Sequence, residues 1–403
     1  MTTVAPPTAP LETPQAPPAR PRLSRRARRL LFRALPLGLV GLLIVVLGGG
    51  YLYVSHKIGQ IHKIAVAGLV PVTGPSEVFL LAGSDSRAGE SAAQAAHFGT
   101  ASEVAGARSD VIILVHIDTA TGAVAMLSIP RDTFLPIPGT GSSNRINVAF
   151  DTGPSLLVAT VSQDYGIPIN HFAEISFDGL RQLTDAVGGV CMNFPYPARD
   201  GSPTGTGNES GLSIPTAGPQ VLNGTMALSL VRSRYYQYFE NGYWHAEGTG
   251  DIGRITRQHE YMRALASKLI HSSLHNPFTA TSVLNKGVQA LTVDSALSTN
   301  AILGLGWHMK SVKPSGIPSW TMPYYADNDY ESYGDVLMPE TSADHQVISQ
   351  WENYQPPSSA PATTAAPAHG SGSTAAPSGT SGSAGASSVP GLTPAPPWDP
   401  TPC

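Results

Sequence analysis

The stretch RSDVIILVHIDTATGAVAMLSIPRD, residues 108–132, decides the fold of this chain. Two apolar runs, 110–118 and 123–129, are separated by Thr-Ala-Thr-Gly, and this pattern predicts two buried strands joined by a short turn. Charged residues lie at the outer ends of both runs: Arg108, Asp110, Arg131 and Asp132. The stretch therefore predicts a buried hairpin whose ends carry polar chemistry.

Strands and helices alternate on both sides of this hairpin. Further strands are predicted at residues 78–83, 172–176, 190–194 and 321–325. Helices are predicted at residues 154–165, 177–187, 223–231, 251–273, 281–290 and 299–312. This alternation predicts an α/β domain in which a central mixed sheet is sandwiched by helices.

A transmembrane helix is predicted to precede this domain. Residues 34–54 contain no charged side chain, and 21 helical residues reach about 31 Å, enough to cross a bilayer core. Seven arginines precede the span, and this bias predicts a cytoplasmic N-terminus and an extracytoplasmic domain at the cell membrane. A cleaved signal peptide and a nucleic-acid-binding arm are the alternatives. The run is long for a signal peptide and lacks a small-x-small site, and arginines beside a span fit topology and lipid contact better than nucleic acid.

Composition predicts five parts in the chain of 403 residues. Residues 1–33 form a disordered basic arm, 34–54 the single span, 55–76 a stalk, 77–353 the catalytic domain and 354–403 a low-complexity Ser/Thr/Gly/Ala/Pro tail. The tail has too little apolar surface to fold by itself. We expect Cys191 to be a buried apolar residue that does not pair with Cys403, because Cys403 ends this tail.

Charged residues recur where predicted strands end. Asp85 and Arg87 follow the strand at 78–83, and Arg108 and Asp110 precede the next one. Asp85 and Asp110 together supply the carboxylates that a hard cation such as Mg²⁺ prefers, with Mn²⁺ as an alternative.

A further group lies on the predicted helix at 251–273. Asp251, Arg254 and Gln258 are spaced i, i+3 and i+7, so they share one face in the first two turns, where free N–H groups favour an anion. A capped helix with an Asp–Arg pair is the structural alternative.

Arginine is the residue best suited to bidentate phosphate contact. Residues 1–33 carry a net charge of +6 and the whole chain −4, so the outer part carries −10. Seven arginines nevertheless recur at element ends of this acidic part: Arg87, Arg108, Arg131, Arg232, Arg234, Arg254 and Arg257. This grouping predicts binding of a metal-bound pyrophosphate. Hydrolase elbows, zinc-protease motifs and phosphate loops are absent from the sequence.

These pieces resemble the LytR–CpsA–Psr family of cell-wall glycopolymer ligases over about residues 78–269. Seven segments follow the order of the family: LLAGSDSR, RSDVIILVHID, MLSIPRDTFLPIPG, RINVAF, INHFAEISFDGLRQLTDAVGGV, GTMALSLVRSR and GDIGRITRQ. The resemblance implies an α/β sandwich with a deep apolar groove for a polyprenyl chain. It also implies transfer of a glycosyl-1-phosphate from a polyprenyl-pyrophosphate carrier to peptidoglycan, with release of polyprenyl phosphate.

The resemblance assigns roles to the charged residues. The pyrophosphate-binding residues match Arg131, Arg232, Arg234, Arg254 and Gln258, with Arg87 and Arg257 nearby. The Mg²⁺ ligands match Asp85 and Asp110, with Arg108 beside them. Asp251 is expected to orient the arginines, and either it or Asp132 is the expected general base.

The stretch between Arg234 and Asp251 is long and aromatic-rich, and it predicts an acceptor site, a lid or a surface insertion. Two other functions remain open: a hydrolase of lipid-linked pyrophosphate and a non-catalytic lipid-binding or regulatory protein. The sequence leaves open which glycopolymer is transferred.

Overall fold

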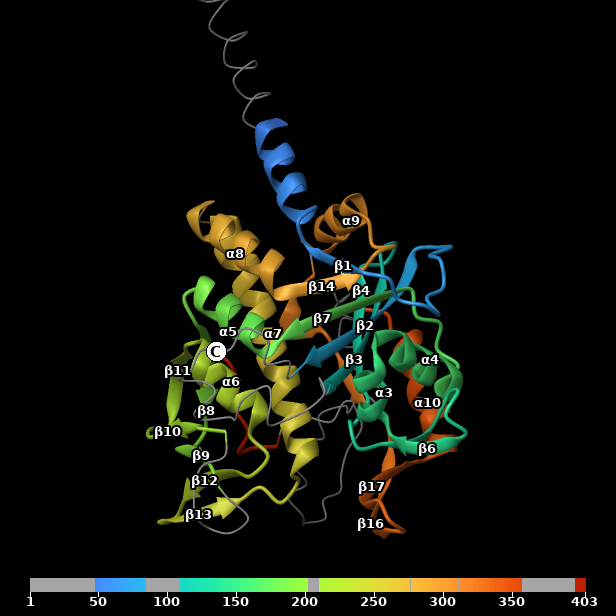
Figure 1. Cartoon of the computed structure of the whole chain (residues 1–403). Helices are drawn as coiled ribbons and strands as arrows, with labels where there is room; N and C mark the ends of the chain where they lie inside the picture. The colour runs from blue at the N-terminus through green and yellow to red at the C-terminus, as the bar shows by residue number, and fades with distance from the viewer. Residues whose placement is uncertain (1–47, 85–108, 202–209, 276, 311, 357–395) are drawn as a thin grey trace, which may run out of the picture. The chain divides into compact units, whose positions relative to one another are not determined.

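The computed structural model describes residues 48–84, 109–201, 210–275, 277–310, 312–356 and 396–403 (Figure 1). Residues 48–58 are helical, and Ser55–Cys403 form one compact unit. Most of the predicted span, the basic arm and most of the tail lie outside the described residues. No described helix combines the length and the apolar character that a membrane crossing requires.

A mixed seven-stranded sheet forms the centre of this unit. Its order is β1 (His62–Ile64), β14 (Leu291–Asp294), β7 (His171–Ser176), β2 (Ser76–Ser84), β3 (Ser109–Asp118), β4 (Ala123–Ser128) and β15 (Ser319–Thr321). The β2–β3–β4 meander is antiparallel, whereas β1–β14, β2–β7 and β4–β15 pair in parallel. The hairpin predicted at residues 110–129 is therefore confirmed, and its strands β3 and β4 lie between β2 and the edge strand β15.

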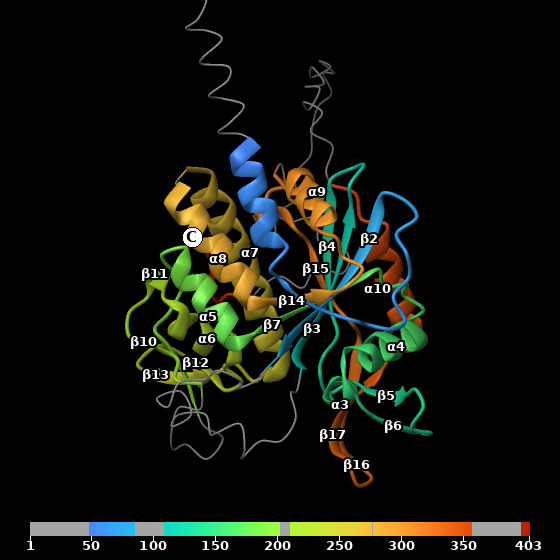
Figure 2. The same cartoon turned by 45° about the horizontal axis from the view of Figure 1, so that its top comes forward.

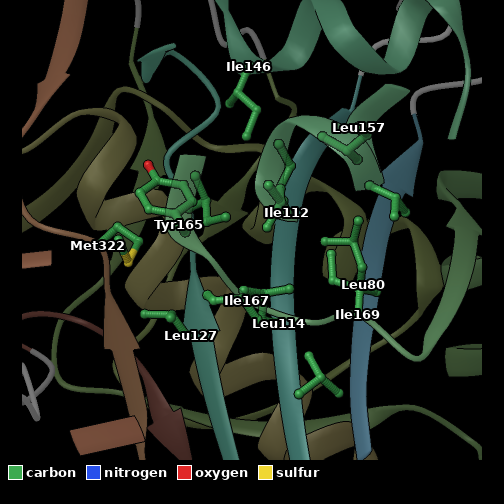
Figure 3. Packing of buried hydrophobic residues seen from close by; sticks show 14 of the residues in the cluster. Leu80, Ile112, Leu114, Leu127, Ile146, Leu157, Tyr165, Ile167, Ile169 and Met322 are labelled. Carbon is green, nitrogen blue, oxygen red and sulfur yellow. The ribbon is translucent and has the colours of Figure 1, made fainter. Parts of the chain in front are cut away.

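One face of the sheet is covered by α3 (Ile146–Thr152), α4 (Pro154–Tyr165) and α10 (Thr341–Glu352) (Figures 1 and 2). Figure 3 shows Leu80, Ile112 and Leu114 from neighbouring strands in one cluster with Leu157 of α4 and with Ile167. Alternate residues of a strand point to one face, so Leu80 and Ala82 enter this layer while Leu81 and Gly83 face the other side.

The other face is covered by α5 (Phe177–Ala186), α6 (Gly224–Arg232), α7 (Asp251–His275) and α8 (Pro277–Ala290) (Figure 2). Ser176 caps α5 by accepting from the backbone N–H of Gly179, and Asn223 caps α6 in the same way from Met226. These polar residues start the helices close to where the sequence predicts them. The two packed faces confirm the central mixed sheet between helices.

Smaller elements surround the two layers. The strands are β5 (Phe134–Ile137), β6 (Ser142–Arg145), β8 (Val190–Phe194), β9 (Ala198–Asp200), β10 (Ser213–Ile214), β11 (Gly218–Leu222), β12 (Tyr236–Glu240), β13 (Tyr243–Ala246), β16 (Tyr324–Tyr330), β17 (Gly334–Pro339) and β18 (Thr401–Pro402). The remaining helices are α9 (Thr299–Met309) and the 3-10 turn η1 (Pro314–Gly316). The predicted 235–250 segment forms the β12–β13 hairpin, which pairs with β9.

The end of the chain departs from the sequence prediction. Cys191 on β8 forms a disulfide with Cys403, and β18 pairs with β8 as the outer strand of a small sheet. The expectation that these cysteines do not pair is wrong, because the last eight residues return to the domain. Trp398 stacks on Tyr238 at 5.4 Å between ring centroids. The predicted tail therefore ends in a folded segment.

The predicted stalk at 55–76 also needs correction. Ile58 and Ile61 are buried, β1 adds an edge strand to the main sheet, and β2 already begins at Ser76. The segment is part of the domain because its short strand finds a parallel partner, β14, more than 200 residues later in the chain.

Candidate active site

The first part of the site forms where β4 ends and α7 begins. Arg131 follows β4 by three residues, and its Nε lies 3.3 Å from Asp132 Oδ2 and 3.7 Å from Asp251 Oδ1. Arg254, one turn into α7, places Nη2 2.7 Å from the same Asp251 oxygen. Asp251 therefore lies between two guanidinium groups that come from elements 120 residues apart.

A third guanidinium joins this group from β6. The Nε of Arg145 lies 3.8 Å from Asp132 Oδ1, and its Nη2 donates to the carbonyl oxygens of Tyr333 and Asp335 at 2.5 and 2.9 Å. We call Arg131, Arg145 and Arg254, with Asp132 and Asp251, the arginine cluster. The sequence contains Arg145 in the RINVAF segment, but its own spacing does not indicate a phosphate site.

The arginine cluster is poorly exposed to solvent. The side chain of Arg254 is 2% exposed and that of Arg131 14%. Low exposure weakens solvent screening, so these cations attract an anion more strongly than surface arginines do. Within the described residues, neither buried oxygen of Asp251 has a hydrogen-bond partner of good geometry. Oδ1 is nevertheless ion-paired with Arg254 and Arg131, so Oδ2 is the oxygen that is suited to a bound group.

The carboxyl end of α6 contributes a second pair of predicted arginines. Arg232 is the last residue of α6 and Arg234 follows two residues later, both half-buried. The guanidinium of Arg232 lies 5.1 Å from the ring centre of Phe177. The side-chain amide of Gln258 donates to the carbonyl of Val231 at 2.9 Å, which joins this end of α6 to α7.

The structure gives Arg257 a different environment from the predicted phosphate site. Its side chain is fully buried, and its Nη1 contacts both Glu247 and Asp399, the latter at 3.1 Å. Its Nη2 donates to the carbonyl of Ser233 at 2.9 Å, and its plane lies over Tyr236 at 4.4 Å. Two carboxylates neutralise this guanidinium, so we assign it to the packing of the domain rather than to the pyrophosphate. Helical spacing alone does not separate it from Arg254, one turn away.

An apolar groove adjoins the arginine cluster. It has a volume of about 230 Å³ and lies between the sheet and α5, α6 and α7. Along α7 its wall is formed by Gln258, Tyr261, Met262, Leu265, Ala266 and Leu269. Gln258 lines the groove one turn after Arg254, so a single helix face connects the cationic cluster with the apolar space.

The predicted metal ligands are only partly within the described residues. Asp85, Arg87 and Arg108 lie outside them, and Asp110 is described by its backbone in β3 alone. The β2–β3 register pairs Ser84 with Ser109. Asp85 directly follows β2 in the sequence, and carboxylate oxygens such as those of Asp85 and Asp110 are the donors that a hard cation prefers.

Two buried groups beside the cluster have shifted pKa values. Burial lowers the pKa of His259 to about 3, and Arg263 acts in the same direction, so this ring is neutral and shares a 2.5 Å hydrogen bond with Ser128. Burial raises the pKa of Tyr324, and the nearby Asp251 charge adds to the effect. Tyr324, at the base of the β16–β17 hairpin, is thus a neutral neighbour of Asp251 that sequence reasoning missed.

Comparison with known proteins adds independent information. The model of the LytR_cpsA_psr family matches residues 60–350. A probable cell wall biosynthesis protein, LcpB of Corynebacterium glutamicum, is 31% identical over 329 residues, which cover 79% of this chain and 72% of that protein. A protein of Bacillus cereus named polyisoprenyl-teichoic acid–peptidoglycan teichoic acid transferase TagU is 30% identical over 252 residues, which cover 58% of this chain and 69% of that protein.

Solved structures share the fold. A LytR-Csp2A-Psr enzyme from Actinomyces oris superposes with a TM-score of 0.55 at 23% identity, covering 73% of this chain and 97% of that one. TagV of B. subtilis superposes with a TM-score of 0.52 at 22% identity, covering 71% and 100%. At these identities the likeness concerns the fold, and it matches the mixed sheet between helices described above.

Proposed function

The chain belongs to the LytR–CpsA–Psr family, and we propose that it is a phosphotransferase that moves a glycopolymer from a polyprenyl-pyrophosphate carrier to peptidoglycan. One observation carries this proposal: a single face of α7 connects the arginine cluster to the apolar groove through Asp251, Arg254 and Gln258. A polyprenyl-pyrophosphate has the same division into an anionic head and an apolar chain. The name of the B. cereus relative, a polyisoprenyl-teichoic acid–peptidoglycan teichoic acid transferase, supports both the donor class and the acceptor class.

The reaction exchanges one phosphorus–oxygen bond for another. A hydroxyl oxygen of a peptidoglycan sugar attacks the phosphorus that carries the glycopolymer. The bond from this phosphorus to the bridging oxygen breaks, and polyprenyl phosphate leaves with that oxygen. The hydroxyl proton passes to a carboxylate of the protein. Such a transfer depends on positioning and charge neutralisation more than on covalent catalysis.

The arginines provide the charge neutralisation. Arg131 and Arg254 approach Asp251 from β4 and α7, so both cations are held before the substrate arrives. Arg232 and Arg234 extend the cationic surface at the end of α6, beside Gln258. Preorganised cations stabilise charge that grows on phosphate oxygens without rearranging during the reaction.

Asp251 is the proposed general base. Both oxygens of Asp132 face guanidinium nitrogens, at 3.3 and 3.8 Å, which favours a structural role for that carboxylate. Both arginine contacts of Asp251 fall on Oδ1, whereas its Oδ2 has no hydrogen-bond partner within the described residues. A carboxylate with unused acceptor capacity beside the phosphate site is suited to take the proton of the acceptor hydroxyl.

Mg²⁺ is the proposed cofactor, held by Asp85 and Asp110, with Mn²⁺ as a substitute. When bound, the ion neutralises charge on the pyrophosphate oxygens. We also propose that residues 34–54 anchor the protein as a single span, with residues 1–33 in the cytoplasm and the domain outside the cell membrane. Support for this comes from the uncharged run and the seven arginines before it.

The decisive experiment uses the full-length protein in nanodiscs. A polyprenyl-pyrophosphate oligosaccharide and Mg²⁺ are added with and without a peptidoglycan oligomer, and mass spectrometry follows polyprenyl phosphate and sugar-phosphate attached to the oligomer. Attachment that requires both the oligomer and the metal is the expected result. Release of polyprenyl phosphate without the oligomer identifies a hydrolase, and lipid binding without any product identifies a binding protein.

Variants of two carboxylates test the base assignment. Asp251→Asn should lower kcat about 10²–10³-fold and remove the acidic limb of its pH profile, because the proton acceptor is lost. Asp178→Asn, which breaks a 2.5 Å ion pair with Arg181 on α5, is the matched control and should retain turnover. If Asp132→Asn removes the acidic limb and Asp251→Asn keeps it, Asp132 is the base instead.

A further inference from the structure

Helix α9 is an apolar helix that buries none of its residues. Its sequence, TNAILGLGWHM, contains no Asp, Glu, Lys or Arg, and Ser298 caps it by accepting from the backbone N–H of Ala301 at 3.1 Å. A capped helix on a folded domain normally turns its apolar residues toward the core. In α9 the side chains of Ile302, Leu303 and Leu305 remain half-exposed.

Trp307 is the most exposed residue of this surface. Its side chain is 68% exposed, and the ammonium of Lys310 lies 3.2 Å from the ring centre. Tryptophan with a neighbouring lysine is typical of a membrane interface, where the ring lies among the headgroups and the ammonium reaches water or phosphate. An exposed Trp that continues the apolar surface of a helix indicates an interaction surface, whereas a single exposed apolar residue does not.

The apolar surface continues onto the segment between β1 and β2. Leu69, Val70, Pro71 and Val72 line one hollow of about 400 Å³ together with Ala301 of α9. Val70 and Val72 are 43% and 38% exposed. We call α9 with residues 69–72 the α9 surface.

The α9 surface is tied to the part of the domain that directly follows the predicted span. The ammonium of Lys63 on β1 donates to the carbonyl of Leu297 at 2.7 Å, and the N–H of Ser295 donates to the carbonyl of Ile64 at 2.8 Å. The predicted span ends at residue 54 and β1 begins at His62, so seven residues separate them. The residues just before α9 are therefore hydrogen-bonded to the strand that follows the predicted span in the sequence.

The groove runs toward the end of the domain that carries the α9 surface. Along α7 the groove runs from Gln258, next to the arginine cluster, to Leu269 near the other end of the helix. In both views α9 and α8 lie at one end of the domain and the β16–β17 hairpin, beside the arginine cluster, at the opposite end (Figures 1 and 2). A polyprenyl chain in the groove therefore points from the arginine cluster toward the end that carries α9.

Charge complementarity favours a lipid surface over a protein partner. Residues 34–403 carry a net charge of −10. Four of the six lysines of the chain nevertheless belong to segments around the α9 surface: Lys57, Lys63, Lys310 and Lys313. Lysines attract anionic headgroups.

We propose that the α9 surface lies on the outer face of an anionic bilayer, with Trp307 among the headgroups, and so holds the Leu269 end of the groove at the lipid. This inference rests on the proposed function, because the membrane anchor and the lipid-linked donor are part of it. The contact orients the domain so that a polyprenyl chain can pass from the bilayer into the groove.

The test is depth-dependent quenching of tryptophan fluorescence in the full-length protein. The protein is placed in nanodiscs of phosphatidylcholine and phosphatidylglycerol, with or without bromine on the acyl chains. Bromolipid should quench the wild type more than Trp307→Phe, while Trp244→Phe, on the β13 strand, should be quenched like the wild type. The proposal is overturned if Trp307→Phe and the wild type are quenched equally. Protection of Trp307 from both bromolipid and aqueous iodide also overturns it, because a protein then covers the surface.

A kinetic readout adds the functional consequence. Trp307→Glu and Lys310→Glu should raise KM for a long-chain donor in anionic vesicles at least five-fold and leave kcat and the KM of a short, water-soluble donor unchanged. An unchanged KM for the long-chain donor contradicts the proposed role. Quenching needs no turnover, so Trp307 contact with lipid in a protein that transfers nothing refutes the proposed function but leaves the lipid contact standing.

Discussion

Arg254 and Arg257 illustrate how neighbouring residues of one helix acquire different roles. Both are arginines in the second turn of α7 and both are buried. Arg254 faces Asp251 at the edge of the arginine cluster, whereas Arg257 faces Glu247 and Asp399. Residues three apart on a helix lie on neighbouring parts of one face, so spacing does not separate these two arginines; the carboxylates that surround each guanidinium do. Residue type alone therefore does not identify a ligand for phosphate.

His259 provides a prediction at this scale. The folded protein holds its pKa at about 3, whereas an unfolded histidine titrates near 6.5. Between these values the unfolded chain binds one more proton. The stability that depends on His259 is therefore complete above pH 6.5 and is lost as the pH falls, by about 1.4 kcal/mol per pH unit.

His259→Gln should make stability less sensitive to acid. When the pH falls from 7.5 to 5.5, the Tm of the wild type should decrease more than the Tm of the variant. The difference between the two Tm values should therefore become smaller. Burial raises the pKa values of Asp164 and Asp344 to about 6, so these two carboxyl groups favour the folded state as the pH falls. Both groups are present in the wild type and in the variant, so their effect is the same in the two proteins. His245→Gln, on β13, is the control and should follow the wild type. Parallel loss of Tm in wild type and His259→Gln contradicts the assignment.

At the scale of elements, one face of α7 contributes to both the arginine cluster and the apolar groove. Its first turns supply Asp251 and Arg254, and its later turns form the wall of the groove. A rigid helix keeps the distance between head and tail sites constant, at 1.5 Å per residue. The length of α7 thus sets how far the reacting phosphate lies from the apolar space.

Ala266→Phe tests this division of α7. Ala266 lines the groove and is half-exposed, so the larger ring should occupy space that the polyprenyl chain needs. KM should rise about ten-fold for a long-chain donor and change little for a short-chain one. Ala343→Phe on α10, outside the groove, is the matched control. If KM for the long-chain donor is the same in Ala266→Phe as in Ala343→Phe, the polyprenyl chain binds elsewhere.

The end of the chain acts as a second structural element. β18 pairs with β8, the Cys191–Cys403 disulfide closes a loop of 212 residues, and Asp399 pairs with buried Arg257. Cross-linking such a long loop typically stabilises a protein by about 2–5 kcal/mol. These contacts connect the end of the chain to the helix that carries Arg254.

Removal of the disulfide should therefore lower stability. Cys403→Ser should reduce Tm by roughly 5–10 °C, and dithiothreitol should lower the wild type to the same value. Cys191→Ser combined with Cys403→Ser should add no further loss, because one bond is removed in each case. An unchanged Tm of Cys403→Ser in non-reducing buffer would show that the bond does not form in the purified protein.

At the scale of the whole molecule, the part of the chain before the predicted span and the rest of the chain have opposite net charges. Residues 1–33 carry +6 and residues 34–403 carry −10. The seven arginines directly before the span predict a cytoplasmic arm and an external domain. The charge of −10 makes the arginine cluster a local feature of an acidic surface, since most of that surface repels anions.

Protease accessibility in intact spheroplasts checks this orientation. External proteinase K should degrade the domain and leave an N-terminal epitope within a short protected fragment. Permeabilised spheroplasts are the control, in which the epitope should disappear as well. Protection of the domain in intact spheroplasts would reverse the predicted topology.

Much of the fold could be predicted because its signals are local. The buried runs of β2, β3 and β4, the Gly-Gly turn after α5 and the caps of α5 and α6 depend on residues a few positions apart. Periodicity and capping act over one or two turns, so a single sequence contains them. Asp251, Arg254 and Gln258 were found for the same reason, as neighbours on one helix face.

The sequence by itself therefore determined the β2–β3–β4 strands, most of the helices that cover the sheet, the family and the residue types of the site. Tertiary structure decided which distant segments meet: Arg145 with Asp132, the edge strand β1 with β14, and Asp399 with Arg257, 142 residues apart. A pair of this kind has no local signal, because at least one partner lies in a segment that looks like ordinary loop or low-complexity chain. Its stability depends on burial, hydrogen bonding and charge pairing, which arise only when the folded domain brings the two segments together.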